Sequence, residues 1–419
     1  MKKDLAVIGL GYVGLPLAQE AIRAGLSVVG YDVSDRVITG LNAGKSHVDD
    51  LSDADIQAML AGGFSATKDD QVLADAKAIV ICVPTPLSED GGPDLSAVLG
   101  ATQAVAKNLT KGQLIVLEST TYPGTTEEVV QPILEKGGLR AGEDFYLAFS
   151  PERIDPGNKK FGMRNTPKVV GGINQISTDK AVEMYANFVD TVVRAKGAKE
   201  AEMAKLLENT YRHINIALVN EMAMFCNDLG IDLWDVIRCA STKPFGFQAF
   251  YPGPGVGGHC IPIDPNYLSH QVKTNLGYPF KFVELAQEIN AGMPNYVIRR
   301  VQDQLNSVGK ALNGATVLLL GVTYKPDIAD QRESPAIPIG LGLLEKGANV
   351  LFHDPMVEIW RLEGKELSRV PDLASALAQA DITVMLQDHA SYDADLLIKN
   401  SNLLFDTRGK LDHPEVERL

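Results

Sequence analysis

Short apolar runs alternate with helix-like segments in the first part of the chain. Residues 4–9 (DLAVIG) read as a buried strand, residues 13–24 as a helix, and residues 27–32 (SVVGYD) as the next strand. Two further apolar runs, at 78–83 and 113–118, are each followed by turn residues. Strands that alternate with helices predict a parallel, doubly wound sheet.

The middle of the chain follows a helical pattern instead. Residues 200–229 lack Gly and Pro and carry apolar residues at helical spacing, which predicts one long helix. Those apolar residues are Met203, Leu206, Leu207, Tyr211, Ile214, Leu218, Met222 and Phe225. A helix longer than average can bridge domains or subunits. A Pro- and Gly-rich stretch follows at 245–265, and a second helical region is expected at about 279–305.

The alternation of strands and helices restarts after residue 313. A strand is predicted at 316–320, a helix at 335–346 and a strand at 349–353. The spacing of Gly347, Val350 and Asp354 repeats that of Gly25, Val28 and Asp32. This weak internal repeat predicts an α/β chain with two Rossmann-type, doubly wound domains joined by a long central helix and a helical middle domain. The expected domains are 1–198, 199–305 and 306–419.

Composition narrows the classes of partner. The net charge is −14, and an acidic chain repels phosphate backbones, so no nucleic-acid partner is expected. No uncharged apolar run is long enough to predict a membrane span. The four cysteines form no C-x-x-C pair and no His cluster has zinc spacing. These features predict a reduced, cytoplasmic chain without a metal site.

A glycine fingerprint, Gly9-Leu-Gly11-Tyr12-Val13-Gly14, follows the first predicted strand and opens a helix. Its glycines permit a tight turn, close approach of a pyrophosphate and close packing of the helix on the strand. Asp32 ends the second strand, where a carboxylate binds a ribose 2′-hydroxyl and repels a 2′-phosphate. NAD is therefore expected rather than NADP, although the nearby Arg36 leaves NADP as an alternative cofactor. A glycine turn without a cofactor is the alternative, disfavoured by the strand, helix and acid together.

Polar side chains follow further predicted strands: Thr85 in VPTP, Thr121 in ESTT, and Glu152 with Arg153 in SPER. Loops after the strands of a doubly wound sheet line the ligand crevice. The hydroxyls can contact cofactor or substrate, and the carboxylate can act as a base or orient water. The alternatives are turn chemistry for the threonines and a surface salt bridge for Glu152.

Lys205, Asn209 and Arg212 have i, i+4, i+7 spacing on the long helix and share one face. Spacing alone favours a solvated stripe. The helix is also expected to carry an ordinary solvated surface at Glu202, Glu208 and Glu221.

The stretch 253–265 surrounds a cysteine with glycines and prolines, in the order GPGVGGHCIPIDP. The glycines of this stretch permit positive φ and close approach of a ligand. Asp264 lies four residues after Cys260, and a helix that begins there would favour the thiolate. A buried structural cysteine is the alternative, which suits the other cysteines, Cys82, Cys226 and Cys239. His259 is a less suitable base, because neighbouring side chains point apart.

The last domain carries a charged loop after its first strand. Tyr324, Lys325 and Arg332 lie in this loop, and its two cations suit a pyrophosphate or a carboxylate. The alternative is a loop that leads into a helix, with Ser334 as the cap and Pro335 at the first helical position.

Together these motifs resemble the UDP-sugar 6-dehydrogenase family. GLGYVG, VPTP, ESTTYPGTT, SPER, K-x-x-x-N, GGHCIPIDP and K-P-D-x-x-D-x-R-E-S-P occur in the family order over nearly the whole chain. The resemblance implies an N-terminal NAD domain, a helical middle that forms a homodimer, and a C-terminal domain that binds UDP. It also implies an NAD-dependent, four-electron oxidation of a sugar C6 hydroxyl, in polysaccharide biosynthesis.

The resemblance also implies residue roles. Cys260 would attack the C6 aldehyde and pass through a thiohemiacetal to a thioester. Lys205 and Asn209 would stabilise the oxyanion, Asp264 would tune Cys260 or assist proton transfer, and Glu152 and Thr121 would orient water. The residues expected to touch substrate are Glu152, Arg153, Lys205, Asn209, Arg212, Tyr251, Gly253, Gly257, Tyr324 and Lys325. Those expected at the cofactor are Gly9, Gly11, Tyr12, Val13, Gly14, Asp32, Arg36, Thr85, Thr121 and Arg332.

The sequence around Cys260 implies a substrate branch. The UDP-glucose branch usually reads GGSCFPKD, whereas this chain has His259 and Ile263 in place of that serine and lysine. GGHC resembles the branch that uses N-acetylated hexosamines, and residues 241–252 resemble enzymes of UDP-N-acetylglucosamine. UDP-N-acetylglucosamine is therefore the expected substrate, with UDP-N-acetylmannosamine, UDP-N-acetylgalactosamine and UDP-glucose as alternatives.

Two other classes share part of the pattern. A non-enzymatic NAD-binding regulator would not need Lys205, Asn209, Cys260 and Asp264 together. A two-electron enzyme such as a 3-hydroxyacid dehydrogenase has no use for Cys260 or a second Rossmann-type domain. The yield of NADH per substrate separates these classes, because the four-electron reaction forms two.

Overall fold

The computed structural model describes residues 2–48, 50–88, 92–154, 158, 160–258, 261 and 263–419. The chain divides into two compact units. The first unit comprises residues 1–208 and 266–276, and the second comprises 209–265 and 277–419. The division into domains 1–198, 199–305 and 306–419 stays a prediction.

The first unit is built on a sheet of eight strands in the order β3-β2-β1-β4-β5-β6-β7-β8. Neighbouring strands are parallel except β6 and β7, which are antiparallel. The first six strands have the order of a dinucleotide-binding fold. The strands are β1 (Lys3–Ile8), β2 (Val28–Tyr31), β3 (Ala66–Thr67), β4 (Ala76–Ile81), β5 (Leu114–Leu117), β6 (Tyr146–Phe149), β7 (Lys168–Gly172) and β8 (Val192–Arg194).

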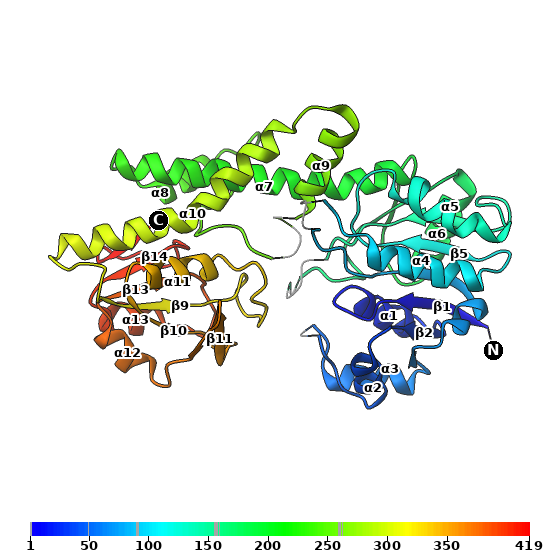
Figure 1. Cartoon of the computed structure of the whole chain (residues 1–419), viewed down its shortest axis with the longest axis horizontal. Helices are drawn as coiled ribbons and strands as arrows, with labels where there is room; N and C mark the ends of the chain where they lie inside the picture. Colours follow the sequence, from blue (N-terminus) through cyan, green and yellow to red (C-terminus); the bar gives the residue numbers. More distant parts are fainter. Residues whose placement is uncertain are drawn as a thin grey trace. The chain divides into compact units, whose positions relative to one another are not determined.

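Helices cover both faces of this sheet (Figure 1). Alternate residues of β1 point to opposite cores, with Leu5 and Val7 in one and Ala6 and Ile8 in the other. The helical segments of this part are α1 (Gly14–Arg23), α2 (Asp35–Asn42), α3 (Asp53–Ala61), η1 (Asp70–Asp75), α4 (Ser96–Asn108), η2 (Thr125–Val130), α5 (Gln131–Leu134), η3 (Glu135–Gly137) and α6 (Gln175–Tyr185). The predicted doubly wound sheet is confirmed.

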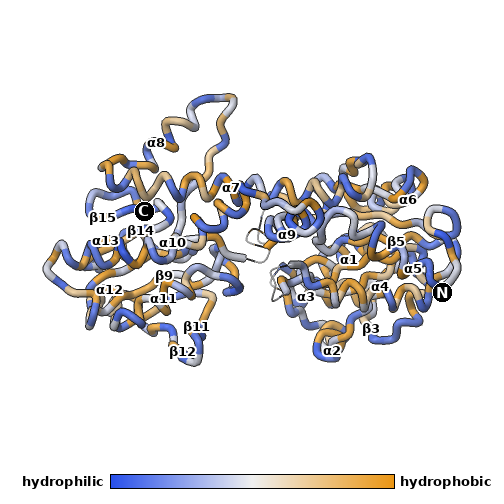
Figure 2. The backbone as a smooth tube through the Cα atoms, turned by 45° about the horizontal axis from the view of Figure 1, so that its top comes forward, coloured by the Kyte–Doolittle hydropathy of each residue, from blue (hydrophilic) through white to orange (hydrophobic). Residues whose placement is uncertain are grey.

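The second unit contains a smaller parallel sheet in the order β10-β9-β13-β14-β15, with a separate β11–β12 hairpin. Helices α10 and α11 pack on one face of it, and α12 and α13 on the other (Figure 1). The elements are β9 (Thr316–Leu320), α11 (Ala336–Glu345), β10 (Asn349–His353), β11 (Ile359–Leu362), β12 (Lys365–Ser368), α12 (Leu373–Gln379), β13 (Ile382–Met385), α13 (Ala394–Asn400), β14 (Leu404–Asp406) and β15 (Val416–Arg418). Figure 2 shows apolar residues concentrated along the strands of both sheets.

The repeat seen in the sequence is a repeat of hydrogen bonding. In the first unit, the backbone N–H of Leu10 donates to Asp32 Oδ2 at 2.9 Å. In the second, the N–H of Val322 donates to Asp354 Oδ2 at 2.7 Å. Each aspartate therefore ties the end of its strand to the turn after the preceding strand of the same unit.

Among the described residues, the middle of the chain contains four helices: α7 (Ala198–Asp228), α8 (Leu233–Ala240), α9 (Asp264–Leu276) and α10 (Lys281–Ser307). The long helix predicted at 200–229 is confirmed. Its apolar stripe is only partly covered, since Leu207, Leu218 and Phe225 are 61%, 53% and 46% exposed. No helix within the described ranges has the length and apolar character needed to cross a bilayer.

Candidate active site

The glycine fingerprint lies in the turn between β1 and α1. Gly9 has φ +86°, and a Cβ there would lie 2.6 Å from the carbonyl oxygen of Cys82. A Cβ at Gly14 would lie 2.0 Å from the carbonyl oxygen of Gly9. The fold itself therefore requires both glycines. Gly11 differs, because a Cβ there would meet no atom within 4 Å, which leaves this side of the turn open to a ligand.

The residues around this turn fit a dinucleotide. Asp32 is half-buried at the end of β2, and its Oδ1 accepts from the N–H of Ser34 at 2.8 Å. Tyr12 is exposed and Val13 half-buried at the start of α1, while Arg36 is exposed on α2. Asp32 thus holds the glycine turn and still reaches the surface beside it, where a ribose hydroxyl would lie.

The two threonine motifs behave differently. Thr85 is buried, and its hydroxyl donates to the carbonyl oxygen of Thr120 at 2.8 Å, as the turn alternative requires. The Tyr267 hydroxyl, on the part of α9 in the same unit, donates to the Thr85 carbonyl oxygen. Thr121 is also buried, but its Oγ1 has no hydrogen-bond partner within the described part of the chain. A buried hydroxyl in that state is suited to a ligand or water.

Lys205 is buried, so the solvated stripe that spacing alone favoured is wrong for this residue. Its Nζ donates to the carbonyl oxygen of Glu152 at 2.7 Å. Glu152 Oε1 in turn accepts from the N–H groups of Arg153 and Ile154 at 2.7 and 2.6 Å. The structure therefore brings Lys205 and Glu152 together within the first unit. Glu152 is buried and pairs with the buried Lys168, whereas the alternative placed it in a salt bridge at the surface.

Arg153 pairs with a different carboxylate. Its NH2 lies 2.7 Å from Glu208 Oε1, and its NH1 donates to the carbonyl oxygen of Pro167 at 2.6 Å. These contacts fix the guanidinium against α7, where Glu208 is exposed as expected. Arg212, one turn further along α7, is exposed.

The expectation of a solvated Glu202 is wrong. Glu202 is 1% exposed, and its carboxylate accepts from the N–H groups of Gly124 and Thr126 at 2.6 and 2.9 Å. Burial raises its pKa to about 7 against the effect of these donors. The helical period places Glu202 on the buried side of α7, where it holds the start of η2 and so the segment that carries Thr121.

Asn209 and Asp264 meet in the second unit. The Asn209 amide Nδ2 donates to Asp264 Oδ2 at 2.6 Å, and Asp264 is 2% exposed. Helix α9 begins at Asp264, as the reading of the cysteine stretch required. His259 and Cys260 lie outside the described residues, so their predicted roles stay predictions.

The glycine-rich stretch packs on the charged loop of the second unit. A Cβ at Gly257 would lie 2.7 Å from the Glu333 carbonyl oxygen and from Tyr324 Cβ, so no larger residue fits. The N–H of Gly258 donates to the Arg332 carbonyl oxygen at 3.3 Å. Two motifs that lie about 75 residues apart in the sequence are thus joined.

The remaining predicted contacts of this unit are more exposed. The Arg332 side chain is exposed and forms a two-bond pair with Asp330, with NH2 to Oδ2 at 2.6 Å. Tyr251 is 57% exposed and stacks on Trp234 with ring centroids 6.0 Å apart. Lys325 is half-buried. Their roles toward ligands stay predictions.

For the charged loop of the last domain, the alternative was a simple entry into a helix, with Ser334 as the cap and Pro335 at the first helical position. That alternative is correct in part. Ser334 Oγ accepts from the N–H of Ala336 at 3.3 Å, so the serine does cap. Helix α11 begins at Ala336, however, one residue later than the alternative placed it, with Pro335 at the cap position.

Two buried or half-buried cationic side chains, Lys168 and Arg408, lie outside every motif identified in the sequence. Lys168, the first residue of β7, is 4% exposed between two carboxylates. Arg408 is half-buried after β14, and a Cβ at Gly253 would lie 3.0 Å from its NH1. The sequence does mark Lys168, because it is a lysine at the start of an otherwise apolar strand. No local pattern marks Arg408.

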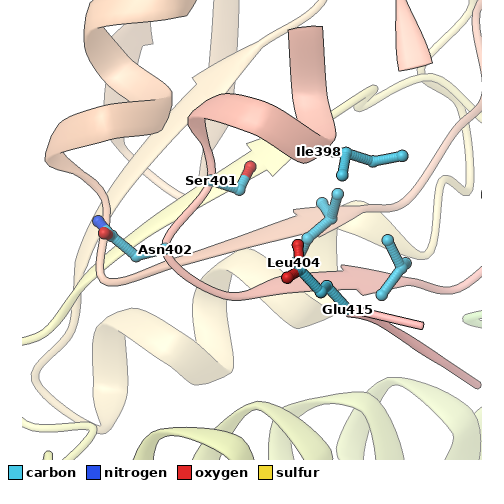
Figure 3. A pocket seen from close by; sticks show the side chains of 6 residues that line it. Ile398, Ser401, Asn402, Leu404 and Glu415 are labelled. Carbon is cyan, nitrogen blue, oxygen red and sulfur yellow. The ribbon is translucent and has the colours of Figure 1, made fainter. Parts of the chain in front are cut away.

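The structure has a separate hollow at the edge of the smaller sheet (Figure 3). Its volume is about 340 Å³, and Ser401, Asn402 and Leu404 line it together with residues before and within β15. These residues lie at the amino ends of their strands, whereas ligands of doubly wound sheets bind at the carboxyl ends. The hollow is therefore not the active site. No group of three or more potential metal ligands occurs within the described ranges.

Comparison with known proteins identifies all three parts of the chain. Residues 3–189 match the NAD-binding domain, 199–292 the central domain and 318–413 the UDP-binding domain of the UDP-glucose/GDP-mannose dehydrogenase family. A UDP-N-acetyl-D-mannosamine dehydrogenase of Methanococcus maripaludis is 36% identical, over 98% of this chain and 94% of its own. A UDP-N-acetyl-D-glucosamine 6-dehydrogenase of Pseudomonas aeruginosa is 38% identical, over 85% and 84%.

Solved structures agree with the sequence matches. The UDP-D-ManNAc dehydrogenase from Pyrococcus horikoshii has a TM-score of 0.89 and 32% identity, with 99% of this chain and 98% of that chain covered. The cofactor turn described above also fits the NAD-binding part of the match. This chain therefore belongs to the UDP-glucose/GDP-mannose dehydrogenase family and is an NAD-dependent UDP-sugar 6-dehydrogenase.

Proposed function

We propose that the chain oxidises the C6 hydroxyl of a UDP-N-acetylhexosamine, UDP-N-acetylglucosamine first among them, to the uronate. The observation that carries the chemistry is the start of α9 at Asp264, where the Asn209 amide binds the carboxylate at 2.6 Å. The acid of this pair lies four residues after Cys260 in the sequence, and the amide is hydrogen-bonded to that acid.

The proposed reaction has three stages. The first oxidation removes a hydride from C6 and a proton from its hydroxyl, which leaves an aldehyde. The Cys260 thiolate adds to this aldehyde, and loss of a second hydride from C6 converts the thiohemiacetal to a thioester. Water then adds to the thioester carbonyl, the C–S bond breaks, and the carboxylate and the thiolate are released. Bound NAD supplies the hydride acceptor for both oxidations.

The chain's own residues support each stage. The buried Lys205 ammonium and the Asn209 amide would stabilise the oxyanion that forms on the C6 oxygen. The Glu152 carboxylate and the Thr121 hydroxyl, which is buried without a partner among the described residues, would orient the water. Asp32 would bind the ribose hydroxyl at the glycine turn.

The substrate prediction concerns the acetamido group. UDP-N-acetylglucosamine should give a kcat/KM above that of UDP-glucose, because a pocket built to pair an amide leaves polar groups unpaired with a hydroxyl. Each unpaired group costs about 1–3 kcal/mol, or roughly tenfold to hundredfold in kcat/KM. Steady-state NADH formation from the four UDP-sugars, measured side by side, provides the test.

The kcat/KM values for UDP-N-acetylglucosamine, UDP-N-acetylmannosamine, UDP-N-acetylgalactosamine and UDP-glucose distinguish the four candidate substrates. Equal or better use of UDP-glucose would show that the GGHC interpretation is wrong. A higher kcat/KM for UDP-N-acetylmannosamine or UDP-N-acetylgalactosamine would keep the N-acetylhexosamine class and correct the stereochemistry. One NADH per sugar, instead of two, would contradict the four-electron reaction.

A second proposal concerns assembly. The exposed apolar side chains of α7, Leu218 and Phe225 among them, form a stripe that a second copy of the chain would cover. We expect a homodimer in solution.

Leu218→Glu with Phe225→Glu should convert the dimer to a monomer, as measured by sedimentation equilibrium, because the two introduced charges would be buried against an apolar partner surface. Val308→Glu, at an exposed apolar position 52% accessible at the end of α10, is the control and should stay dimeric. A double variant that remains dimeric would exclude this surface.

A further inference from the structure

A lysine is enclosed by two carboxylates inside the first unit. Lys168 is 4% exposed, and its Nζ lies 3.0 Å from Glu118 Oε2 and 3.3 Å from Glu152 Oε2. Glu118 Oε1 also accepts a hydrogen bond from the hydroxyl of Tyr185, which is fully buried. The cluster therefore contains one cation and two acids with almost no access to water.

The sheet itself brings these groups together. Glu118 follows β5, Glu152 comes shortly after β6, and Lys168 opens β7. Strands β5 and β6 are parallel neighbours, and β6 and β7 are antiparallel neighbours. The antiparallel return of β7 therefore places its first residue at the same sheet edge as the ends of β5 and β6, which is the edge where a doubly wound sheet binds ligands.

The electrostatics keep Lys168 charged. The two carboxylates raise the pKa of Lys168 although its burial opposes the charged form. Burial raises the pKa of Glu118, and the lysine opposes that shift. A buried carboxylate that loses its only cation is strongly destabilised. Lys168 thus allows two acids to lie close together in a dry part of the protein.

Glu152 links this cluster to the proposed site. Its side chain is held by Lys168, and its backbone carbonyl oxygen accepts from Lys205 Nζ at 2.7 Å. The space beside Glu152 and Lys168 is about 10 Å³, enough for about one water molecule and far too small for a sugar. Lys168 therefore acts on the reaction through Glu152 and not on the substrate.

We infer that Lys168 is a positioning residue that holds the Glu152 carboxylate for hydrolysis of the thioester. The inference rests on the proposed function, in which water adds through its oxygen to the thioester carbonyl carbon. One proton of that water passes to Glu152 as the C–S bond breaks and the Cys260 thiolate leaves. The two hydride transfers precede this step and do not need Glu152 as a proton acceptor.

Lys168→Met should therefore slow hydrolysis and spare the oxidations. Mixing enzyme, NAD and the preferred UDP-sugar should give a burst of about two NADH per active site. A steady rate at least about tenfold below wild type should follow, since a positioned general base contributes roughly 10²–10⁴-fold. Mass spectrometry of the quenched protein should show the sugar-nucleotide thioester accumulating.

Lys168→Arg, which keeps the cation, should restore much of the steady rate. Lys180→Met, at an exposed ion pair of α6, should match wild type.

A charge-balanced variant separates positioning from folding. Lys168→Met with Glu118→Gln removes one cation and one acid, and Gln can still accept the Tyr185 hydrogen bond. This variant should recover thermal stability yet still hydrolyse the thioester slowly, because Glu152 lacks its partner. A wild-type hydrolysis rate in the double variant would overturn the positioning role. So would a Lys168→Met variant whose burst and steady rate fall in parallel.

The proposed function has its own readout in the same experiment. Wild-type enzyme that forms no NADH from any UDP-sugar would overturn the proposed function, and the inference about Lys168 with it. Wild-type enzyme that turns over normally beside a Lys168→Met variant with unchanged hydrolysis would overturn only the role of Lys168.

Discussion

Cys260→Ala will abolish uronate formation. Without the thiol, no nucleophile traps the C6 aldehyde, so the second oxidation has no thiohemiacetal to act on. Loss of a nucleophile costs orders of magnitude in kcat, and we expect at least roughly a thousandfold here. The measurement is uronate formed per enzyme, by chromatography of the sugar nucleotides, together with NADH.

Cys226→Ala is the matched control. Cys226 is buried on α7, 4% exposed, and packs in the core of the second unit. Its replacement should lower thermal stability slightly and leave turnover largely intact. Normal uronate formation by Cys260→Ala would reject covalent catalysis, and loss of turnover in both variants would point to a general effect of removing a thiol.

Gly14→Ala will disrupt the cofactor turn and the fold together. The added Cβ would lie 2.0 Å from the Gly9 carbonyl oxygen and 2.9 Å from a methyl group of Val7, and backbone atoms cannot yield by that much. Helix α1 must move away from β1, at a cost of several kcal/mol, comparable to the largest single-site effects. We expect a fall in Tm of several degrees and at least a hundredfold rise in the KM for NAD.

Two other glycines test this explanation. Gly100 lies within α4 with no atom within 4 Å of its Cβ position, so Gly100→Ala should stabilise the helix by about 0.5–1 kcal/mol and leave the KM for NAD unchanged. Gly11→Ala should keep the Tm and still weaken NAD, because its Cβ would point into the space open to the pyrophosphate. A Gly14→Ala variant with wild-type Tm would show that α1 can adjust without cost.

Several features of the fold were determined by local sequence. The strands at 316–320 and 349–353 and the long helix of the middle region appear where the apolar pattern predicted them. The Gly9–Gly14 turn and Asp32 likewise follow from neighbouring residues. Such features are local, because a strand, a helix or a tight turn depends on residues within a few positions.

The burial and the contact partners of the charged side chains were decided by the tertiary structure. Spacing on α7 placed Lys205 and Glu202 in solvent, yet both are buried, since elements distant in the sequence cover that side of the helix. The carbonyl oxygen that Lys205 binds lies 53 residues away in the sequence. A helical pattern shows which residues share a face, but not what packs against it.

The cluster around Lys168 shows the same limit most clearly. Glu118, Glu152 and Lys168 follow or begin three different strands, and each alone resembles an ordinary turn or surface residue. Only the antiparallel return of β7 beside β6 brings the lysine between the two acids. The sequence by itself determined the strands, the long helix and the cofactor turn, because these depend on short-range periodicity and backbone sterics. The charge state and neighbours of buried ionisable groups were decided by tertiary structure, because Coulomb interactions and desolvation depend on distance in space.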